Sequence, residues 1–411
     1  MNEFYDLISV PEACARLKSH LPGQLPSEEV GLLEACGRVL AEDVRAQEDV
    51  PGFRRSTVDG FAVRARDTFG ASESAPAMLE VVGTIPMGEE ARDPLPPLSS
   101  FAISTGGMLP PGADAVVMLE YVEHVSEGVI EVYRPVAPGE NVVEPGDDLR
   151  AGQVILPAGH RLRPQDLGLL SAAGYTRVRV RRRPVVGILA TGDEVVAPEE
   201  KPAPGQVRDV NSYSLAGLVQ EAGGLPRLGG IVPDDYQALY RRSAELLAQC
   251  DLLLLSGGSS VGRRDYTLQV IQELGAPGVL VHGLALQPGK PAIGGVARGK
   301  PIFGLPGHPV SAMVVFAQLV RPVLEHLLGR RPAELPPPTV PARLKRNLPS
   351  APGREDFVRV RLLREGDEWW AEPVLGKSGL LTTMTKADGL VRIPSASEGL
   401  LQGTLVQVEL F

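Results

Sequence analysis

The sequence predicts a multidomain protein of the α/β plus β class, and three observations predict it. The chain has 411 residues, enough for about three domains of roughly 150 residues each. Between residues 183 and 330, short apolar runs alternate with segments of helical spacing. Residues 45–149 and 331–411 are instead rich in proline, glycine and short apolar runs. We therefore expect a central doubly wound α/β domain with a parallel-rich sheet, an inserted β domain and a compact C-terminal β barrel or sandwich.

The central segment alternates strand and helix most regularly. Segments of this length form βαβ units with right-handed crossovers, so a parallel sheet is expected, with its ligand site beyond the carboxyl ends of the strands. The run Asp251-Leu-Leu-Leu-Leu-Ser256 is typical of a strand that is buried on both faces. Strands are expected at 185–190, 229–232 and 251–255, helices at 212–222, 236–249 and 266–274, and a long apolar helix from 309 toward 328.

The remaining elements follow from local signals. Ser9-Val-Pro-Glu12 is a capping box that opens a helix, and Pro164 to Ala173 reads as a short helix ended by Gly174. Gly152 to Arg163 resembles a hairpin. Arg177 to Arg183 alternates valine with arginine, which favours an edge strand with solvated arginines over an anion site. The expected domains are 1–44 with 150–182 (mixed α/β), 45–149 (inserted β), 183–330 (α/β) and 331–411 (C-terminal β), the last after a proline-rich linker.

Composition excludes several classes of function. The net charge of −9 disfavours nucleic acid as a partner. Cys14, Cys36 and Cys250 are odd in number and widely spaced, which argues against a disulfide framework or zinc site and for a reducing cytoplasm. No signal-peptide core is apparent beside Glu3 and Asp6. No apolar run of about 18 residues stands out, so no membrane span is expected.

The loop after the leucine strand is the first candidate site. Ser256, Gly257, Gly258, Ser259 and Ser260 are small, so the backbone is free to approach a ligand and to point N–H groups at an anion. A tight strand-to-helix turn without a ligand explains the same residues about equally well. The nucleotide motifs G-x-x-x-x-G-K-[ST] and G-x-G-x-x-G are absent, which disfavours ordinary NTPases and dinucleotide-dependent dehydrogenases.

Acidic residues follow the expected strands at the same sheet edge. Glu194, Asp234 and Asp265 each lie in such a loop, and Lys290 lies in Gln287-Pro-Gly-Lys290-Pro291. Taken singly, each is more readily explained as a cap or a solvated residue. Together, carboxylates beside an anion-binding loop suit Mg²⁺, which binds hard oxygen ligands together with substrate phosphates.

Other candidates lie in the flanking β segments. Asp59 precedes Gly60 in an expected turn, and Thr105 lies in the loop Ser104-Thr105-Gly-Gly107; turn chemistry explains both residues at least as well as function does. In the C-terminal segment, Arg359 and Ser378 are candidate anion contacts, with surface polarity as the alternative.

Taken together, these motifs resemble the molybdopterin molybdenumtransferase family, the MoeA-like enzymes that include the E domain of gephyrin. The resemblance covers essentially the whole chain, although the third domain alone is shared with related adenylyltransferases. It rests on 58–63, 105–106, 113–118, 190–194, 251–267, 288–291 and the Gly-Leu-Pro-Gly-x-Pro-Val-Ser-Ala segment 304–312.

The resemblance implies a fold and a reaction. It implies that 1–44 with 150–182 form a dimerisation domain, that 183–330 bind molybdopterin, and that the C-terminal domain is a barrel. Family members insert molybdate into adenylylated molybdopterin and release AMP in a Mg²⁺-dependent step. An elongated homodimer is expected, with an active cleft shared between two chains.

By the same resemblance, each candidate residue receives a role. Glu194, Asp234 and Asp265 would bind the metal, and Lys290 with the loop 256–260 would hold anionic groups. Asp59 and Thr105 would come from the inserted β domain, Pro306 and Pro309 would shape the loop before the last helix, and Arg359 and Ser378 would close the cleft.

Three positions depart from the family pattern. Segment 141–148 lacks the arginines that are common there, Gln287 occupies a place that is often basic, and His308 replaces the commoner asparagine. His308 could form the asparagine's hydrogen bond or make the site sensitive to pH.

Two rival functions stay open. One is an adenylyltransferase that activates molybdopterin with ATP, and the other is a non-catalytic scaffold with the same dimer. The choice between molybdenum and tungsten, the enzymes that accept the cofactor and any direct transfer from an adenylyltransferase partner stay undetermined by the sequence.

Overall fold

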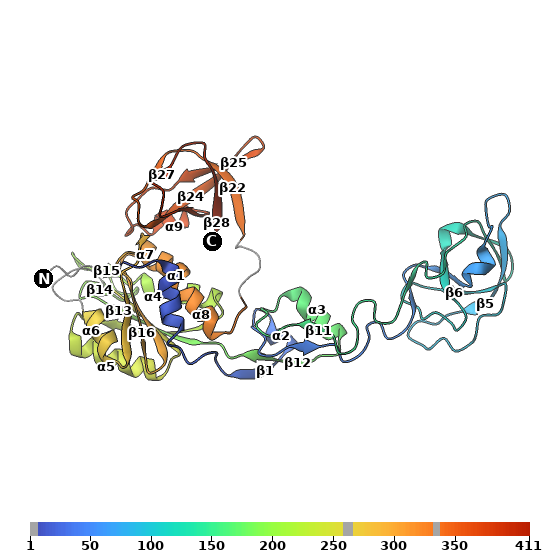
Figure 1. The fold of residues 1–411 in the computed structure, drawn as a ribbon, viewed down its shortest axis with the longest axis horizontal. Helices are drawn as coiled ribbons and strands as arrows, with labels where there is room; N and C mark the ends of the chain where they lie inside the picture. Colours follow the sequence, from blue (N-terminus) through green and yellow to red (C-terminus); the bar gives the residue numbers. More distant parts are fainter. Residues whose placement is uncertain (1–6, 258–265, 332–337) are drawn as a thin grey trace.

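The structure is a computed structural model that describes residues 7–257, 266–331 and 338–411. The chain is elongated (Figure 1). An α/β domain and a C-terminal barrel lie beside each other at one end, an inserted β domain lies at the other, and a small mixed domain lies between them.

The α/β domain is built on a six-stranded sheet of order β16-β13-β17-β21-β20-β18. Neighbouring strands from β16 to β21 are parallel, but β20 runs antiparallel to both β21 and β18, so the sheet is mixed at one side. The strands are β13 (Val185–Thr191), β16 (Leu225–Val232), β17 (Leu252–Ser256), β18 (Pro277–His282), β20 (Ile293–Ala297) and β21 (Lys300–Leu305), with β14 (Val195–Val196), β15 (Val207–Arg208) and β19 (Leu286–Gln287) outside the sheet.

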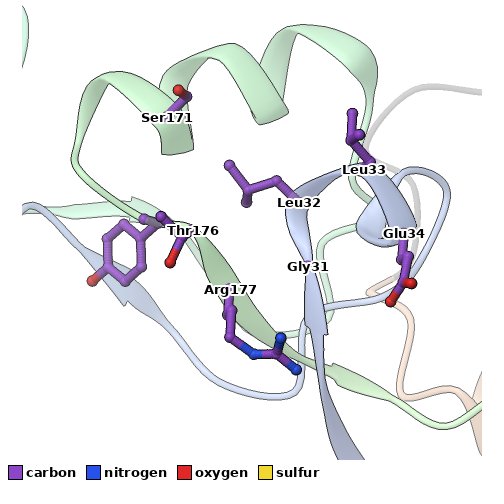
Figure 2. A pocket seen from close by; sticks show the side chains of 8 residues that line it. Gly31, Leu32, Leu33, Glu34, Ser171, Thr176 and Arg177 are labelled. Atoms are coloured by element: carbon purple, nitrogen blue, oxygen red, sulfur yellow. The ribbon is translucent and has the colours of Figure 1, made fainter.

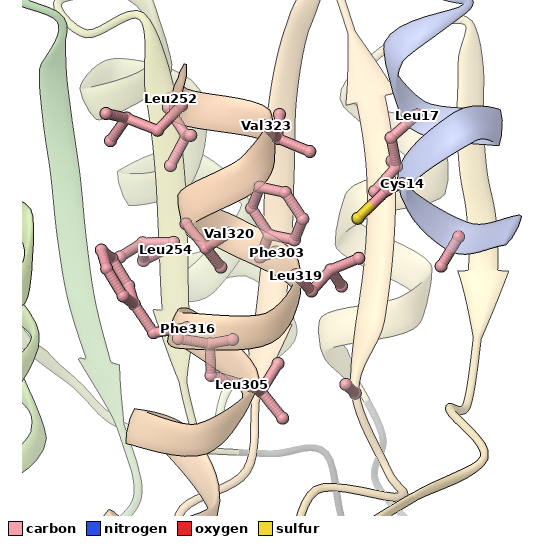
Figure 3. Close-up of a cluster of buried hydrophobic side chains, with 14 of the residues drawn as sticks. Cys14, Leu17, Leu252, Leu254, Phe303, Leu305, Phe316, Leu319, Val320 and Val323 are labelled. Carbon is pink, nitrogen blue, oxygen red and sulfur yellow. The ribbon is translucent and has the colours of Figure 1, made fainter. Parts of the chain in front are cut away.

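Helices cover both faces of this sheet, which confirms the doubly wound prediction. Leu252 and Leu254 of β17 pack into one core cluster, and Leu253 and Leu255 pack into the other, all four fully buried. Figure 3 shows the first cluster, where the helix that carries Phe316, Leu319 and Val320 packs on the strands of the sheet. The face with this first cluster is covered by α1 (Val10–Lys18), α4 (Asn211–Glu221), α7 (Pro309–Val315), the π-helical η3 (Phe316–Val320) and α8 (Arg321–Leu327). The other face is covered by α5 (Tyr236–Ala248) and α6 (Tyr266–Glu273).

Helix α1 belongs to this core. Its side chains Ala13, Cys14 and Leu17 pack in the same cluster as the sheet, so the structure separates α1 from the mixed domain to which 1–44 are assigned on sequence. Ser9 caps α1 as expected, because its Oγ accepts a hydrogen bond from the Glu12 N–H. An amphipathic helix shows which face is buried but not which neighbouring domain buries it.

The segment Pro309–Leu327 corrects another expectation. It is the long apolar helix expected from 309 toward 328, but its 19 residues are by length and composition enough to cross a membrane, and a run of that length and composition is not expected from the sequence. Most of it is buried inside the protein, and Phe316, Leu319 and Val320 are fully buried against the sheet. Burial among other helices accounts for its apolar composition.

The mixed domain contains a two-stranded antiparallel pair, β1 (Ser27–Gly31) with β12 (Arg177–Arg181), packed on α2 (Leu32–Ala35) and α3 (Pro164–Ala172). The hairpin expected at 152–163 is wrong. Strand β11 (Val154–Leu156) instead pairs with β2 (Val44–Arg45), and Arg161 forms a bridge with Val39. Both segments of the expected hairpin therefore pair with the N-terminal part of this discontinuous domain and not with each other.

The inserted β domain has a six-stranded sheet of order β7-β4-β6-β5-β9-β8. Its core contains Phe61, Leu79, Val117 and Ile130. The elements are β3 (Arg55–Ser56), β4 (Gly60–Val63), η1 (Ala65–Thr68), β5 (Ala77–Thr84), β6 (Ser99–Ile103), β7 (Ala115–Met118), η2 (Leu119–Tyr121), β8 (Val122–Ser126), β9 (Val129–Val132) and β10 (Val142–Val143).

The C-terminal domain is a closed barrel, since β24 pairs with both β25 and β26 and thereby joins the two ends of the sheet. Strand β19 of the α/β domain also pairs with β24, in register Gln287 with Asp356, so the barrel is attached to the α/β domain through main-chain hydrogen bonds. The elements are β22 (Thr339–Leu344), β23 (Leu348–Pro349), β24 (Glu355–Glu365), β25 (Glu368–Pro373), α9 (Thr382–Thr385), β26 (Gly389–Ile393), β27 (Gly399–Leu400) and β28 (Leu405–Leu410).

Candidate functional site

The loop that follows β17 packs closely against the end of β13. Gly257 has φ +110°, and a Cβ atom there would lie 2.3 Å from the Thr191 carbonyl oxygen, so no larger residue fits. Ser256 is buried, and the Gly257 N–H donates to the Leu305 carbonyl over 3.2 Å. The small residues at the start of this loop therefore have a packing role. The candidate residues Gly258, Ser259, Ser260 and Asp265 lie outside the described residues.

Carboxylates line the adjacent strand ends. The Thr191 hydroxyl donates to Asp234 Oδ1 over 3.0 Å, and the Asp234 N–H donates to Asp193 Oδ1 over 3.0 Å. Glu194 lies in the same loop, where its Oε2 would be 2.7 Å from a Cβ atom placed on Gly192. Asp193 and Glu194 are exposed, and Asp234 is half-buried.

These oxygen donors are of the type that Mg²⁺ binds. Within the described residues, however, no three acidic, histidine or cysteine side chains are grouped closely enough to hold a metal ion. The assignment of Glu194, Asp234 and Asp265 as metal ligands therefore stays a prediction, with Asp265 outside the described part.

The junction between the α/β domain and the barrel brings together a second set of candidates. Arg359, on β24, donates through Nη2 to the Gly376 carbonyl over 2.9 Å. Its Nε and Nη1 are buried without a hydrogen-bond partner in the described part of the chain, and burial lowers the pKa of this guanidinium. Ser378 follows in the same loop, and its Oγ lies 2.9 Å from His308 Nδ1. An arginine with unsatisfied buried N–H groups has the donors that an oxyanion requires.

The predicted loop residues of the α/β domain border the same junction. Pro306 is buried, and Pro309 occupies the first turn of α7, where the missing N–H of proline is tolerated. Lys290 is exposed, and its carbonyl accepts the Leu284 N–H over 2.9 Å. Lys290 comes three residues after Gln287, which pairs with β24, the strand that carries Arg359.

The two candidates of the inserted β domain contact each other. Asp59 Oδ1 accepts hydrogen bonds from the Thr105 N–H over 2.7 Å and from the Thr105 hydroxyl over 3.1 Å. This local bonding is the turn chemistry considered above. The domain that holds this pair lies at the opposite end of the chain from the strand ends of the α/β domain (Figure 1), so a single chain does not bring the two sets together.

Comparison with known proteins decides the family. Residues 8–174 match the MoeA N-terminal region (domain I and II), residues 187–326 a "probable molybdopterin binding domain", and residues 341–411 the MoeA C-terminal region (domain IV). The molybdopterin molybdenumtransferase of Bacillus subtilis is 34% identical over 406 residues, which cover 98% of this chain and 93% of the relative. The chain belongs to the MoeA family.

Solved structures agree with this assignment. A crystal structure of the molybdopterin biosynthesis MoeA protein from Pyrococcus horikoshii has a TM-score of 0.85 at 34% identity, covering 99% of this chain and 100% of that one. A second structure of a MoeA protein from this organism has a TM-score of 0.79 at 41% identity, covering 98% and 99%. The MoeA-like order of domains therefore extends over the whole chain.

One residue of this MoeA-family chain was missed by sequence reasoning. Asn211, the first residue of α4, donates through Nδ2 to Ser256 Oγ over 2.7 Å and to the Gly307 carbonyl over 2.9 Å. A carbonyl oxygen can only accept, so the contact with Gly307 fixes the orientation of the amide. Asn211 thereby ties together the two loops that follow β17 and β21. Its position at a helix start in Asp209-Val-Asn211-Ser212 is the available signal, and it suggests no more than a cap.

Arg54, from an earlier part of the chain, lies beside the arginine-poor segment 141–148. Arg54 Nε lies 2.8 Å from Glu144 Oε2, and this hydrogen bond raises the pKa of Arg54. An arginine is thus present beside the segment, but a carboxylate already engages it.

Two open pockets are lined by none of the candidate residues, although the second lies next to Asp234. One, of about 470 Å³, lies in the mixed domain between 31–34 and 171–177 (Figure 2). Leu33 at its margin is 91% exposed. The other, of about 360 Å³, lies beside the edge strand β16 and is lined by Pro233, next to Asp234.

Proposed function

We propose that the chain inserts molybdate into adenylylated molybdopterin and releases AMP, the final step of molybdenum cofactor biosynthesis. Membership of the MoeA family over the whole chain supports the reaction, and relatives such as the Bacillus subtilis protein are named molybdopterin molybdenumtransferase. The observation that carries the proposal in the structure is Arg359, a half-buried residue whose guanidinium has two buried nitrogens without a partner in the described residues.

An oxyanion would satisfy Arg359. Molybdate carries negative oxygen atoms that accept charge-assisted hydrogen bonds from a guanidinium fork. Ser378 adds a hydroxyl in the loop whose Gly376 carbonyl already holds Nη2 of Arg359. Lys290 adds positive charge from the segment that joins β19 to β20. These groups would hold molybdate while the dithiolene approaches.

The chemistry needs no protein nucleophile. Molybdate exchanges one oxo ligand for the two dithiolene sulfurs, and the two thiol protons leave with that oxygen as water, so the oxidation state of the metal is unchanged. Separately, water cleaves the phosphoanhydride bond and frees AMP. Neutralising the phosphate oxygens lowers the barrier to this step, and Mg²⁺ supplies that neutralisation when bound.

The chain's own residues have distinct roles in this proposal. Glu194, Asp234 and Asp265 would hold Mg²⁺, and the loop 256–260, of which 258–260 lie outside the described residues, would hold anionic groups. Asn211 holds Ser256 and Gly307 together through two hydrogen bonds. Pro306 and Pro309 limit the motion of the loop between β21 and α7.

A homodimer would complete the cleft. Asp59 and Thr105 lie at the far end of the chain from Asp234 (Figure 1), so they would reach the strand ends of a partner chain. An adenylyltransferase that supplies the substrate and molybdoenzymes that accept the product are the expected partners. A cytoplasmic location fits these partners.

Hybrid dimers test the shared cleft. Asp59→Asn and Asp234→Asn homodimers should each be inactive in AMP release. Mixing the two, with exchange of subunits, should restore up to about one functional cleft per hybrid dimer. Restoration in hybrids supports a cleft built from two chains, and equal inactivity of hybrids and parents would exclude it.

Substitution of Arg359 tests the oxyanion site. Loss of charge-assisted hydrogen bonds, each worth about 1.5–3 kcal/mol, should raise the KM for molybdate roughly 10- to 100-fold in Arg359→Ala. Arg361 is exposed on the same strand, so Arg361→Ala is the matched control and should leave this KM unchanged. Equal effects of the two substitutions would remove Arg359 from the site.

A further inference from the structure

His308 links the α/β domain to the barrel. It precedes α7 but makes no side-chain cap to its own helix. Its Nδ1 instead lies 2.9 Å from Ser378 Oγ in the barrel, a contact between residues 70 positions apart. The main chain reinforces this contact, because the Val310 N–H donates to the Ser378 carbonyl over 3.2 Å.

The barrel loop Gly376–Gly379 is held at both ends. Arg359 bonds the Gly376 carbonyl over 2.9 Å at one end. At the other end, Gly379 lies beside His308, since a Cβ atom placed there would be in ordinary van der Waals contact, 3.6 Å from Cδ2 of the imidazole ring. Ser378, a candidate substrate contact, lies between these two attachments.

Two further attachments between the domains do not involve this loop, namely the pairing of β19 with β24 and the packing of Phe357 and Leu390 of the barrel in the core of the α/β domain. Strand β19 pairs with β24 at Leu286–Glu355 and Gln287–Asp356, which places the strand that carries Arg359. The loop Gly376–Gly379 follows β25 and has its own contacts with α7 through His308 and Val310. The position of Ser378 relative to the α/β domain therefore depends on the contacts that this loop makes with His308 and Val310.

We propose that His308 is a positioning residue that fastens the loop Gly376–Gly379 to the start of α7 and so sets the affinity of the cleft for its oxyanion substrate. The proposal rests on the proposed function for the identity of that substrate. It assigns His308 no part in bond breaking. It also accounts for the asparagine-to-histidine departure, since an asparagine amide can form the same hydrogen bond to a serine hydroxyl.

Hydrogen–deuterium exchange of the full-length protein tests the contact without using activity. In His308→Ala, the Val310 amide and the amides of 377–380 should exchange roughly three- to tenfold faster, as expected for the loss of one hydrogen bond. His308→Asn should stay close to the native rates. His20→Asn, an exposed histidine beyond α1, is the matched control and should change none of these amides.

A double-mutant cycle identifies the partner. If Ser378 is the residue that His308 holds, His308→Ala should add little to the faster exchange of a Ser378→Ala background. Additive effects of the two substitutions, or native exchange in His308→Ala, would overturn the proposal.

Kinetics connect the contact to the substrate. His308→Ala should raise the KM for molybdate roughly three- to tenfold with kcat nearly unchanged, and His308→Asn should restore the native KM. A loss of kcat alone would overturn the positioning role. If the native protein releases no AMP while His308→Ala still accelerates exchange at Val310, the proposed function fails and the contact between the domains stands.

Discussion

Gly257 provides the sharpest structural prediction. The residue has φ +110°, which L side chains rarely adopt, and an added Cβ would lie 2.3 Å from the Thr191 carbonyl oxygen, far inside van der Waals contact. Strain of about 1–3 kcal/mol from the backbone adds to about 1–3 kcal/mol from overpacking. We therefore expect Gly257→Ala to destabilise the α/β domain by roughly 2–6 kcal/mol or to displace the loop.

Gly217 is the matched control for this substitution. It lies within α4, has no positive φ, and a Cβ there would meet no atom within 4 Å. Alanine is the better helix former by about 1 kcal/mol, so Gly217→Ala should be neutral or slightly stabilising.

Scanning calorimetry, which can resolve the transitions of separate domains, is the assay. The transition that involves the α/β domain should fall by roughly 5–15 °C in Gly257→Ala, or activity should be lost where the loop moves instead. It should not fall in Gly217→Ala. A Gly257→Ala protein with native stability and native activity would refute the close approach of this loop to the end of β13.

Three further predictions concern buried polar contacts. Asn211→Ala should lower the free energy of unfolding by about 1–3 kcal/mol, because Ser256 and the Gly307 carbonyl each lose a hydrogen-bond donor. Hydrogen exchange in the loops after β17 and β21 should become faster, and unchanged exchange would contradict the prediction. Burial alone would raise the pKa of Asp166, but hydrogen bonds from Arg163 and His160 outweigh burial and lower that pKa to about 2. The resulting stability, about 2 kcal/mol, is present above the unfolded pKa near 4 and lost as the pH falls toward 2. In acid unfolding followed by circular dichroism, this pH-dependent stability should be absent from Asp166→Asn and present in Asp93→Asn, an exposed control. Identical unfolding curves for the two variants would contradict the prediction. Arg182 donates to both carboxylate oxygens of Asp251, over 2.9 and 2.8 Å, and so connects the end of β12 to the start of β17. Arg182→Ala should loosen the mixed domain relative to the α/β domain. Spin labels in the two domains should then show a broader distribution of distances, and an unchanged distribution would contradict this prediction.

The α/β core was predictable because local pattern and tertiary burial coincide there. Four consecutive leucines at 252–255 require apolar neighbours on both faces, and the two core clusters supply them. The closed barrel was harder to predict. Its closure depends on β24 pairing with both β25 and β26, and short alternating runs do not specify such partners.

The features that the sequence did not predict have one physical cause: they are contacts between residues far apart in the sequence, and such contacts leave little signal in the local pattern. Helix α1 packs on the α/β sheet although the mixed domain follows it in sequence. Arg182, read as part of a solvated basic strand, pairs with Asp251 at 69 residues' separation. Asn211 and the His308–Ser378 contact likewise join loops that only the fold brings together.

Reconstitution with purified protein, adenylylated molybdopterin, Mg²⁺ and molybdate tests the central claim most directly. The measured quantities are AMP release and activation of a cofactor-free molybdoenzyme. The proposal predicts AMP release coupled to activation, with no activation when molybdate is omitted. Transfer of AMP from ATP to molybdopterin would favour an adenylyltransferase instead, and binding of adenylylated molybdopterin without AMP release or activation would contradict the enzyme in favour of a scaffold.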